Sequence, residues 1–212
     1  MPASTELRRF PRQSRGRRRV DALLEAAAAE IRDVGYEAAT MSSIATRAGA
    51  SIGSLYQFFP NKGAVVQALR EHYCEEFEQL WAPLAVEAKH LSLEDLVGRM
   101  VDSTVCFIEQ HPAFLALLDA PGGTHAPAAV RERFQQLVAT FLRARRPRMS
   151  PEKALRLATM TLQMIKAMNF LYRDQSPGER RPYIQEFKIL LLRYLECRMD
   201  HPIEVKGNHQ LN

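Results

Sequence analysis

The polar side chains between Ala38 and Gly63 are of a kind that binds nucleic acid. The segment holds two basic residues, Arg47 and Lys62, and no acid at all. Hydroxyls and an amide fill many of its other polar positions, and such groups donate hydrogen bonds to phosphates and base edges at a small desolvation cost. They are Thr40, Ser42, Ser43, Ser51, Ser54, Tyr56 and Gln57. The composition of this segment favours contact with DNA.

Two short helices joined by a tight turn are predicted to position these groups. Thr40 can cap the first helix, in which the apolar residues recur at helical spacing. Gly49 ends that helix, because glycine accepts the left-handed backbone of a sharp turn. Ser51 can cap the second helix, and Pro60 ends it. This pattern predicts a helix-turn-helix, whose second helix lies in the DNA major groove. A generic helical hairpin in a core, with a tyrosine at its rim, fits the same spacing.

A longer run of matching residues separates these alternatives. From Val20 to Leu69 the chain resembles the N-terminal domain of the TetR family of transcriptional regulators. The matching features are Gly35-Tyr36, Thr40, Ile44-Ala45, Ala48-Gly49, Gly53-Ser54-Leu55-Tyr56 and Phe58-Phe59-Pro60-Asn61-Lys62. They cover about fifty residues in the right order. Two departures are Gly63, where the family usually has an acid, and Ala50, where a valine is usual.

The resemblance implies a homodimer, a divergent ligand-binding domain and release from operator DNA when ligand binds. It also assigns DNA contacts within the helix-turn-helix. Phosphate contacts are expected from Thr40, Ser54, Tyr56 and Lys62. Contacts to bases are expected from Ser42, Ile52, Gly53, Gln57 and Phe58, and the bare Gly53 lets the backbones approach closely. Ser43 and Ser51 complete the expected DNA-binding set.

The composition bounds the remaining function classes. At 212 residues, 46% of them hydrophobic, the chain is long enough for one large or two small domains. It has no uncharged apolar run long enough to span a membrane and no apolar secretory signal. The three cysteines, Cys74, Cys106 and Cys197, are odd in number and far apart, which suits reduced, buried thiols in a cytoplasm. A redox switch is the alternative.

The positive charge is concentrated at the N-terminus. Residues 1–19 hold seven arginines and one glutamate, so they contribute +6, while the whole chain has a net charge of +5. Residues 1–16 are predicted to be a basic arm that is disordered without a partner. The arm can follow phosphates or enter a minor groove, or it can be a solubilising tail. We favour the DNA contact, because Val20 to Leu80 carry nine acids against four bases.

An all-α fold of about nine helices is predicted, in two domains. The predicted divisions are the arm at 1–16, the helix-turn-helix domain at 17–63, a connecting helix at 64–82, a ligand-binding and dimerisation domain at 83–200 and a flexible tail at 201–212. The first helix is expected at about 17–34, and Pro83 is expected to end the connecting helix. Later helices are expected near 92–110, 112–119, 126–144, 151–173 and 182–199.

The last two helices are apolar on more than one side, so they need cover from a partner. We expect them to form a four-helix dimer interface that includes Leu191 and Leu195. Large, soft side chains in the same domain are candidates for an apolar ligand pocket, oriented by polar groups, although each is also explained by core packing. The candidate set is Met100, Cys106, Phe107, His111, Phe114, Phe134, Met160, Gln163, Met164 and Phe170. Asn169 is a further candidate orienting group.

Other chemistries find little support in the sequence. The six histidines never pair at metal-ligand spacing, and no Gly-rich phosphate loop or nucleophile elbow is present, so no metal, cofactor or catalytic residue is predicted. The preferred interpretation is a dimeric regulator, most simply a repressor, that binds an inverted-repeat operator in double-stranded DNA and is released by a small molecule. The alternatives are an architectural DNA-binding protein without ligand control and an enzyme in the C-terminal domain.

Overall fold

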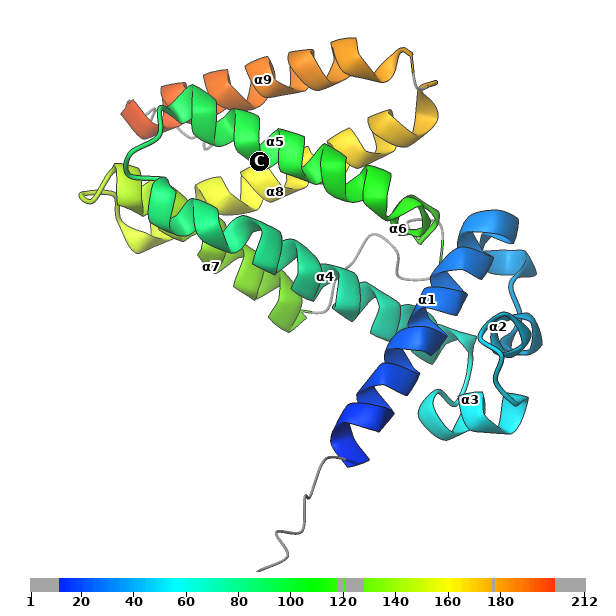
Figure 1. Ribbon diagram of the computed structural model, residues 1–212. Helices are drawn as coiled ribbons and strands as arrows, with labels where there is room; N and C mark the ends of the chain where they lie inside the picture. Colours follow the sequence, from blue (N-terminus) through cyan, green and yellow to red (C-terminus); the bar gives the residue numbers. More distant parts are fainter. Residues whose placement is uncertain (1–11, 118–119, 121–127, 177, 201–212) are drawn as a thin grey trace, which may run out of the picture. The chain divides into compact units, whose positions relative to one another are not determined.

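The computed structural model describes residues 12–117, 120, 128–176 and 178–200. Over these residues the chain forms nine helices and no strand, which confirms the predicted all-α fold (Figure 1). The helices are α1 (Arg12–Ala38), α2 (Met41–Arg47), α3 (Ile52–Phe58), α4 (Lys62–Glu87), α5 (Leu93–Gln110), α6 (Pro112–Ala116), α7 (Ala128–Arg145), α8 (Pro151–Asp174) and α9 (Arg180–Asp200).

The chain divides into two compact units. The first contains the described residues up to Tyr73 together with those of 112–124, and the second contains 74–111 and the described residues from 128 onwards. The helix α4 therefore begins in the first unit and continues into the second. The segment that begins with α6 was expected in the C-terminal domain, but it packs on α1 and belongs to the first unit.

Aliphatic side chains from four helices form the core of the first unit. Leu23, Ala27 and Ile31 of α1 are fully buried, and they recur at the spacing of one helix face. The other fully or almost fully buried members are Ile44, Ala45, Leu55, Val65, Val66 and Leu69. Because Leu55 is the only residue of α3 that is buried, few side-chain contacts hold this helix on the first unit.

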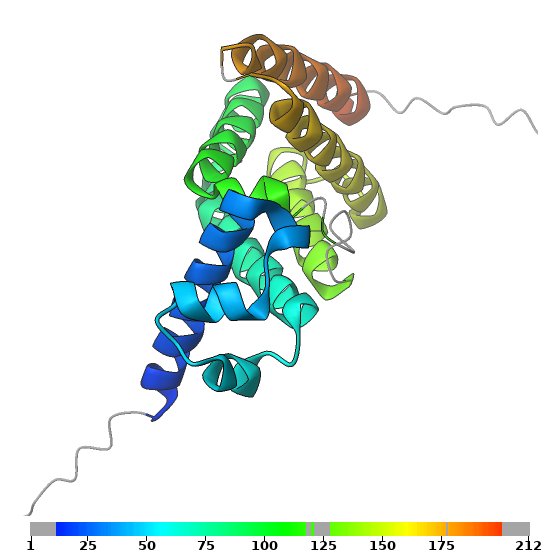
Figure 2. The ribbon, with the colours of Figure 1, turned by 90° about the vertical axis from the view of Figure 1, so that its right-hand side faces the viewer.

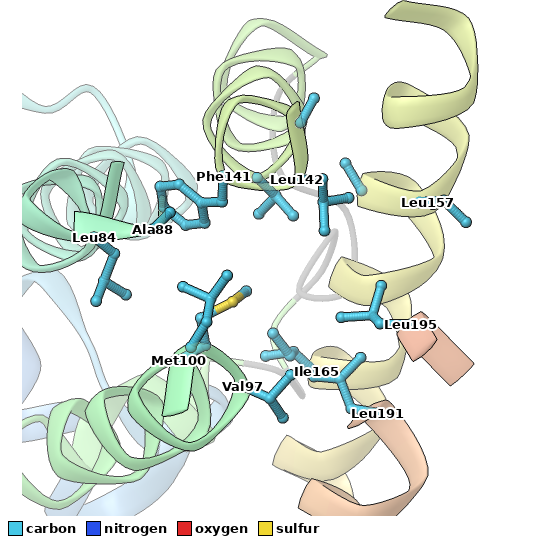
Figure 3. Packing of buried hydrophobic residues seen from close by; sticks show 14 of the residues in the cluster. Leu84, Ala88, Val97, Met100, Phe141, Leu142, Leu157, Ile165, Leu191 and Leu195 are labelled. Carbon is cyan, nitrogen blue, oxygen red and sulfur yellow. The ribbon is translucent and has the colours of Figure 1, made fainter. Parts of the chain in front are cut away.

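A continuous apolar cluster from α4, α5, α7, α8 and α9 forms the core of the second unit (Figure 3). Trp81 and Phe141 are its largest fully buried side chains. The helix α7 packs along α8, and α9 packs on both α5 and α8. Leu191 and Leu195 lie inside this cluster, so their place is the core of the protomer rather than a dimer surface.

Three helix boundaries differ from the prediction. The helix α1 begins at Arg12, so the last five residues of the expected arm are helical, and a non-helical Gly35 (φ 80°, ψ 165°) interrupts it near its end. The helix α4 continues past Pro83 to Glu87, because Trp81 and Leu84 on either side of the exposed proline are anchored in the core. The helix α9 starts at Arg180, before Pro182.

The cysteines and termini complete this comparison. Cys106 and Cys197 are exposed and Cys74 is partly buried, so the expectation of three buried thiols was wrong. All three are free. Residues 1–11 of the expected arm and the expected tail at 201–212 lie outside the described residues. None of the described helices is both long and apolar enough to cross a membrane.

Candidate nucleic-acid interface

Reciprocal hydrogen bonds fix the start of α2. Thr40 has an extended backbone (φ −125°, ψ 157°), and its Oγ1 accepts from the backbone N–H of Ser43 at 3.0 Å. Ser43 Oγ in turn accepts from the Thr40 N–H at 3.0 Å. This capping box satisfies two backbone donors that a helix start leaves without partners. The hydroxyl of Ser43 therefore serves the fold, whereas Ser42, exposed next to it, is available to a ligand.

A left-handed glycine makes the turn between α2 and α3. Gly49 has φ 58°, and the N–H of Ala50 reaches back to the Ala45 carbonyl at 2.9 Å, as in a Schellman motif. Ser51 then caps α3, with its hydroxyl accepting from the Ser54 N–H at 3.1 Å. Figures 1 and 2 show that α2 and α3 cross steeply across this short turn. The geometry is that of a helix-turn-helix.

The outer face of α3 is more apolar than a solvent-facing helix needs to be. Ile52, Tyr56 and Phe58 remain 46%, 50% and 39% exposed, and Gln57 is exposed between the last two. A seven-residue helix that buries one leucine and presents three large apolar side chains is suited to a contact outside the protomer. Apolar groups recognise the thymine methyl, and the amide of Gln57 can pair with adenine in the major groove.

Gly53 lies in the middle of this exposed face without any structural need for glycine. Its backbone is ordinary helix, and a Cβ placed there would meet nothing within 4 Å. Glycine inside a helix costs about 0.5–1 kcal/mol relative to alanine, so its presence here destabilises α3. An external backbone that approaches closely would account for the missing side chain.

Lys62 is held by the protein itself. Its Nζ donates to the carbonyls of Tyr36 and Glu37 at 2.7 and 3.1 Å and lies 4.2 Å from the Tyr36 ring centroid. These carbonyls directly follow Gly35, whose non-helical backbone interrupts α1. Lys62 was expected to bind a phosphate, and this second role was not predicted from the sequence. An ammonium has three N–H donors, so one of them can still point to a phosphate.

We predict that Lys62→Ala lowers stability as well as DNA affinity. The two carbonyls lose a charged donor in a partly exposed place, which we expect to cost about 1–2 kcal/mol of unfolding free energy. The affinity for all DNA sequences should fall about equally, with a salt slope smaller by about one. Urea unfolding and salt-dependent gel shifts measure the two effects. The exposed Lys89 supplies the control Lys89→Ala, which should change neither. An unchanged unfolding curve for Lys62→Ala would contradict the structural role.

An ion-pair network that was not predicted braces α2 against α1. Arg47 donates to Glu30 at 2.8 Å and to Asp33 at 2.9 Å, and Glu30 is largely buried. The Arg32 guanidinium beside Asp33 lowers the pKa of that carboxyl, and Arg47 adds to this shift. Arg47 is therefore committed to the fold. The helix spacing of Glu30 and Asp33 was the only sequence signal for this network.

The residues expected to form a ligand pocket are distributed over both units. Phe114 lies in the first unit, where its ring packs edge-on against Tyr73 at 6.1 Å. The others lie in the second unit. Of these, Phe107 and Phe134 both contact Phe77, with ring centroids 5.1 and 5.7 Å apart. The His111 ring lies against Phe107, with centroids 4.4 Å apart. Phe107 and Phe134 are therefore brought together around the Phe77 ring, and His111 joins them through its contact with Phe107.

The remaining pocket candidates are more scattered. Met100 is buried in the core cluster, and Met164 packs partly against it. Cys106, Met160 and Gln163 are exposed in the protomer, and Phe170 lies under the Arg173 guanidinium at 5.3 Å. The buried Asn169 has no hydrogen-bond partner for its Oδ1 within the described part of the chain. The same is true of the fully buried Thr161 hydroxyl.

The described residues contain no cluster of histidine, cysteine and acidic side chains that could hold a metal ion. Polar side chains in the second unit instead contact one another. His111 Nε2 lies 3.4 Å from Glu76 Oε2, and the Tyr172 hydroxyl donates to Glu109 at 3.0 Å. Burial is the main cause that raises the pKa of Tyr172, and Glu109 adds to it.

A helix-turn-helix unit joined to a second, all-helical unit is the architecture of a DNA-binding regulator. Two family models match the chain and agree with this class. "Bacterial regulatory proteins, tetR family" matches residues 23–69, and "Tetracyclin repressor-like, C-terminal domain" matches residues 92–195. The chain belongs to the TetR family of transcriptional regulators. No curated protein matches it in sequence.

Solved structures share the fold at low sequence identity. A TetR-family transcriptional regulator from Streptomyces coelicolor superposes with a TM-score of 0.68 at 24% identity, over 84% of this chain and 98% of that one. The fatty acid degradation regulator FadR from Bacillus halodurans gives 0.64 at 16% identity, over 82% and 94%. A TetR-family regulator from Mesorhizobium loti gives 0.63 at 18% identity, over 90% and 98%. At these identities the likeness extends to the fold alone.

Proposed function

We propose that this chain is a repressor that binds an inverted-repeat operator as a homodimer and is released when a small molecule binds its second unit. The observation that carries the DNA-binding part is the outer face of α3. It presents Ile52, Tyr56 and Phe58 to the outside around Gly53. The segment from Ala38 to Gly63 contains no acid that would repel phosphates.

The proposed dimer rests on exposed apolar side chains of α8 and α9. Met160, Leu171, Tyr183, Ile189 and Leu190 are each between 45% and 57% exposed in the protomer. A two-fold arrangement of these helices would cover them in a four-helix interface. Ile189 and Leu190 take the place of the expected Leu191 and Leu195, which the core already covers. Two α3 helices would then meet major-groove faces about 34–36 Å apart.

The proposed control by a ligand rests on the continuity of the chain. Because α4 runs from the first unit into the second, a change in the second unit can be transmitted along one helix. Within the first unit, Arg70 of α4 donates to the carbonyls of Leu117 and Ala120, at 2.9 and 3.1 Å. This bond ties α4 to the segment that follows α6. The ligand must bind the DNA-incompetent state more tightly, since equal affinity shifts nothing.

The two alternatives have weaker support. An architectural DNA-binding protein needs no separate helical unit with its own core, and such a unit makes up more than half of this chain. Family and fold point to a transcriptional regulator rather than an enzyme. Binding to DNA would place the protein in the cytoplasm, which is also the expectation from three cysteines that are odd in number and far apart in the sequence.

The direct test is a footprint on the DNA that flanks the protein's own gene, with the full chain. We expect two protected half-sites that are related by a two-fold axis and lie about one helical turn apart. Protection should disappear when an effector from a panel of small organic molecules is added. A single protected half-site, or protection independent of sequence, would contradict the proposal and favour the architectural alternative.

We further predict that the N-terminal arginines contact phosphates. Replacing Arg8, Arg9, Arg12 and Arg15 by glutamine should weaken operator binding and flatten its salt dependence. The slope should fall by about 0.9 for each phosphate contact that is lost, and by about 3.6 at most. Gel shifts across a range of salt concentrations measure the slope. The control variant replaces three exposed arginines near the end of α7 by glutamine, at Arg143, Arg146 and Arg148. It shows whether a loss of positive charge outside the arm has the same effect on the slope. Equal slopes in the arm variant and the wild type would reduce the arm to a solubilising tail.

A further inference from the structure

A partly buried cation lies on α8 in the second unit. Lys166 is partly withdrawn from water, and burial is the main cause that lowers the pKa of its ammonium group. The positive charge of Arg131, on α7, lowers this pKa further, whereas Cys74 of α4 acts in the opposite direction. The helix α7 packs along α8, and the Gln135 side chain of α7 donates to Thr159 of α8 at 2.9 Å. Arg131 is one turn before Gln135 and Lys166 is two turns after Thr159, so the two cations lie on neighbouring parts of two packed helices. An anionic group bound there would contact two cations at once.

A buried carboxamide lies one helical turn further along α8. Asn169 is 6% exposed, and its Oδ1 is without a hydrogen-bond partner within the described residues. A buried acceptor without a partner lowers stability, so such a group calls for an explanation. Residues three apart on a helix are neighbours on its surface, so Lys166 and Asn169 are presented side by side. A ligand that offers an N–H or O–H group would satisfy the carboxamide.

Aromatic rings lie next to these polar groups. Phe77 follows Cys74 by three residues on α4, and Phe134 follows Arg131 by three residues on α7. The two rings contact each other at 5.7 Å, and Phe107 of α5 contacts Phe77 at 5.1 Å. Because Lys166 lies on the part of α8 that packs against this end of α7, its ammonium and the Phe134 ring belong to the same region of the second unit. Cation, carboxamide and rings thus come from the same part of the second unit.

We propose that the effector of this regulator is an amphipathic anion. Its acidic head group binds Lys166 with Arg131, its N–H or O–H donor pairs with Asn169, and its apolar body packs towards the phenylalanines. An ammonium has three N–H donors, so Lys166 can hold such a head group beside any contact it makes within the protein. This inference rests on the proposed control by a ligand, and it specifies the expected, mostly apolar effector as an acid with an apolar body.

Two fluorescent probes that differ in one group test the proposal. Anilinonaphthalene sulfonate is an amphipathic anion with one N–H, and phenylnaphthylamine has the same rings and N–H without the sulfonate. We expect the wild-type protein to bind the sulfonate about tenfold more tightly, as for a hydrogen bond to a charged group. Lys166→Met should remove this preference and leave the affinity for the neutral probe unchanged. Lys166→Arg should retain most of it.

Matched variants control for damage to the fold. Lys153 lies near the start of the same helix, and Lys153→Met should leave both affinities unchanged. Arg131 is exposed, so Arg131→Gln should fold and weaken the sulfonate alone, by about threefold. Asn169→Leu should weaken both probes equally without lowering the unfolding midpoint, because it removes an acceptor that the fold does not use. A residue needed for packing would instead lower that midpoint.

Several results would overturn the proposal. Equal binding of the two probes by the wild-type protein, or a loss of both probes in Lys166→Met, would show that Lys166 does not recognise an anion. A destabilised Asn169→Leu variant would assign Asn169 to the fold. Operator release is measured separately, by the anisotropy of labelled operator DNA. If the probes bind as expected while operator stays bound, the anion site stands and the proposed control by a ligand fails.

Discussion

Replacing Leu190 by glutamate is expected to convert the protein from a dimer to a monomer and to lower operator affinity at least a hundredfold. Leu190 is 57% exposed on α9, next to Ile189 at 52%, so the protomer covers neither. In a two-fold interface each substitution is made twice, and two unpaired carboxylates would be buried against apolar surface. A monomer that engages one half-site loses the effective concentration that links the two halves, which is worth about 10²–10⁴ in affinity.

Sedimentation velocity measures the assembly, and gel shifts measure the operator affinity. The control is Val86→Glu, because Val86 is 73% exposed on α4 and lies outside α8 and α9. That variant should remain a dimer and bind operator normally. A dimer that persists in Leu190→Glu at micromolar concentration would place the interface on another surface. Glutamate at the fully buried Leu191 is not a substitute test, since it would disrupt the core of the second unit.

Leu190 and Leu191 show what an apolar helix pattern leaves open. A helix that is apolar on several sides must be covered on several sides, and this was predicted for both α8 and α9. The pattern does not say which stripe meets the protomer and which meets a partner, because adjacent leucines are chemically identical. The choice depends on how α9 packs on α5 and α8. That packing is set by contacts far apart in the sequence.

Helix caps were predicted well, because each cap is formed by residues that are close together in the sequence. The caps expected at Thr40 and Ser51 are present, and Asn61, Ser92 and Ser150 cap α4, α5 and α8 in the same way. Asn61 Oδ1 accepts from the Ala64 N–H at 2.9 Å, and Ser92 accepts from the Asp95 N–H at the same distance. A Cβ on residue 63 would lie 3.2 Å from this Asn61 oxygen, so a side chain there would require the cap to shift by a few tenths of an ångström. A short polar side chain followed by a helical pattern fixes such a bond without tertiary structure.

Long-range polar contacts were missed for the converse reason. The carbonyls that hold Lys62 lie 25 and 26 residues away, and the partner of Arg47 in α1 lies 17 residues away. No periodicity reveals such pairs, since a charged side chain on a surface has many potential partners. The same holds for the pocket candidates. Their types suited a ligand, but their grouping around Phe77, and the assignment of Phe114 to the first unit, depend on tertiary packing.

A methyl group at residue 53 is expected to raise the stability of the protein and to lower its affinity for operator DNA, so the two effects can be told apart. Gly53 lies in α3 with ordinary helical backbone and open space around its missing Cβ. Gly53→Ala should raise the unfolding free energy by about 0.5–1 kcal/mol. It should also lower operator affinity about tenfold, because the methyl group would occupy the space into which the DNA backbone or a base edge fits. Gly53→Leu should lower affinity further, to about a hundredth of the wild-type value.

Gly98 provides the matched control. It also lies inside a helix, α5, with nothing within 4 Å of a built Cβ, but it belongs to the second unit. Gly98→Ala should stabilise the protein by a similar amount and leave operator affinity unchanged. Urea unfolding and gel shifts on the four proteins, wild type included, measure both quantities. If Gly53→Ala binds operator like the wild type, α3 does not approach DNA at Gly53. If Gly53→Ala also fails to raise the unfolding free energy, Gly53 is needed for a conformation of α3 other than this helix.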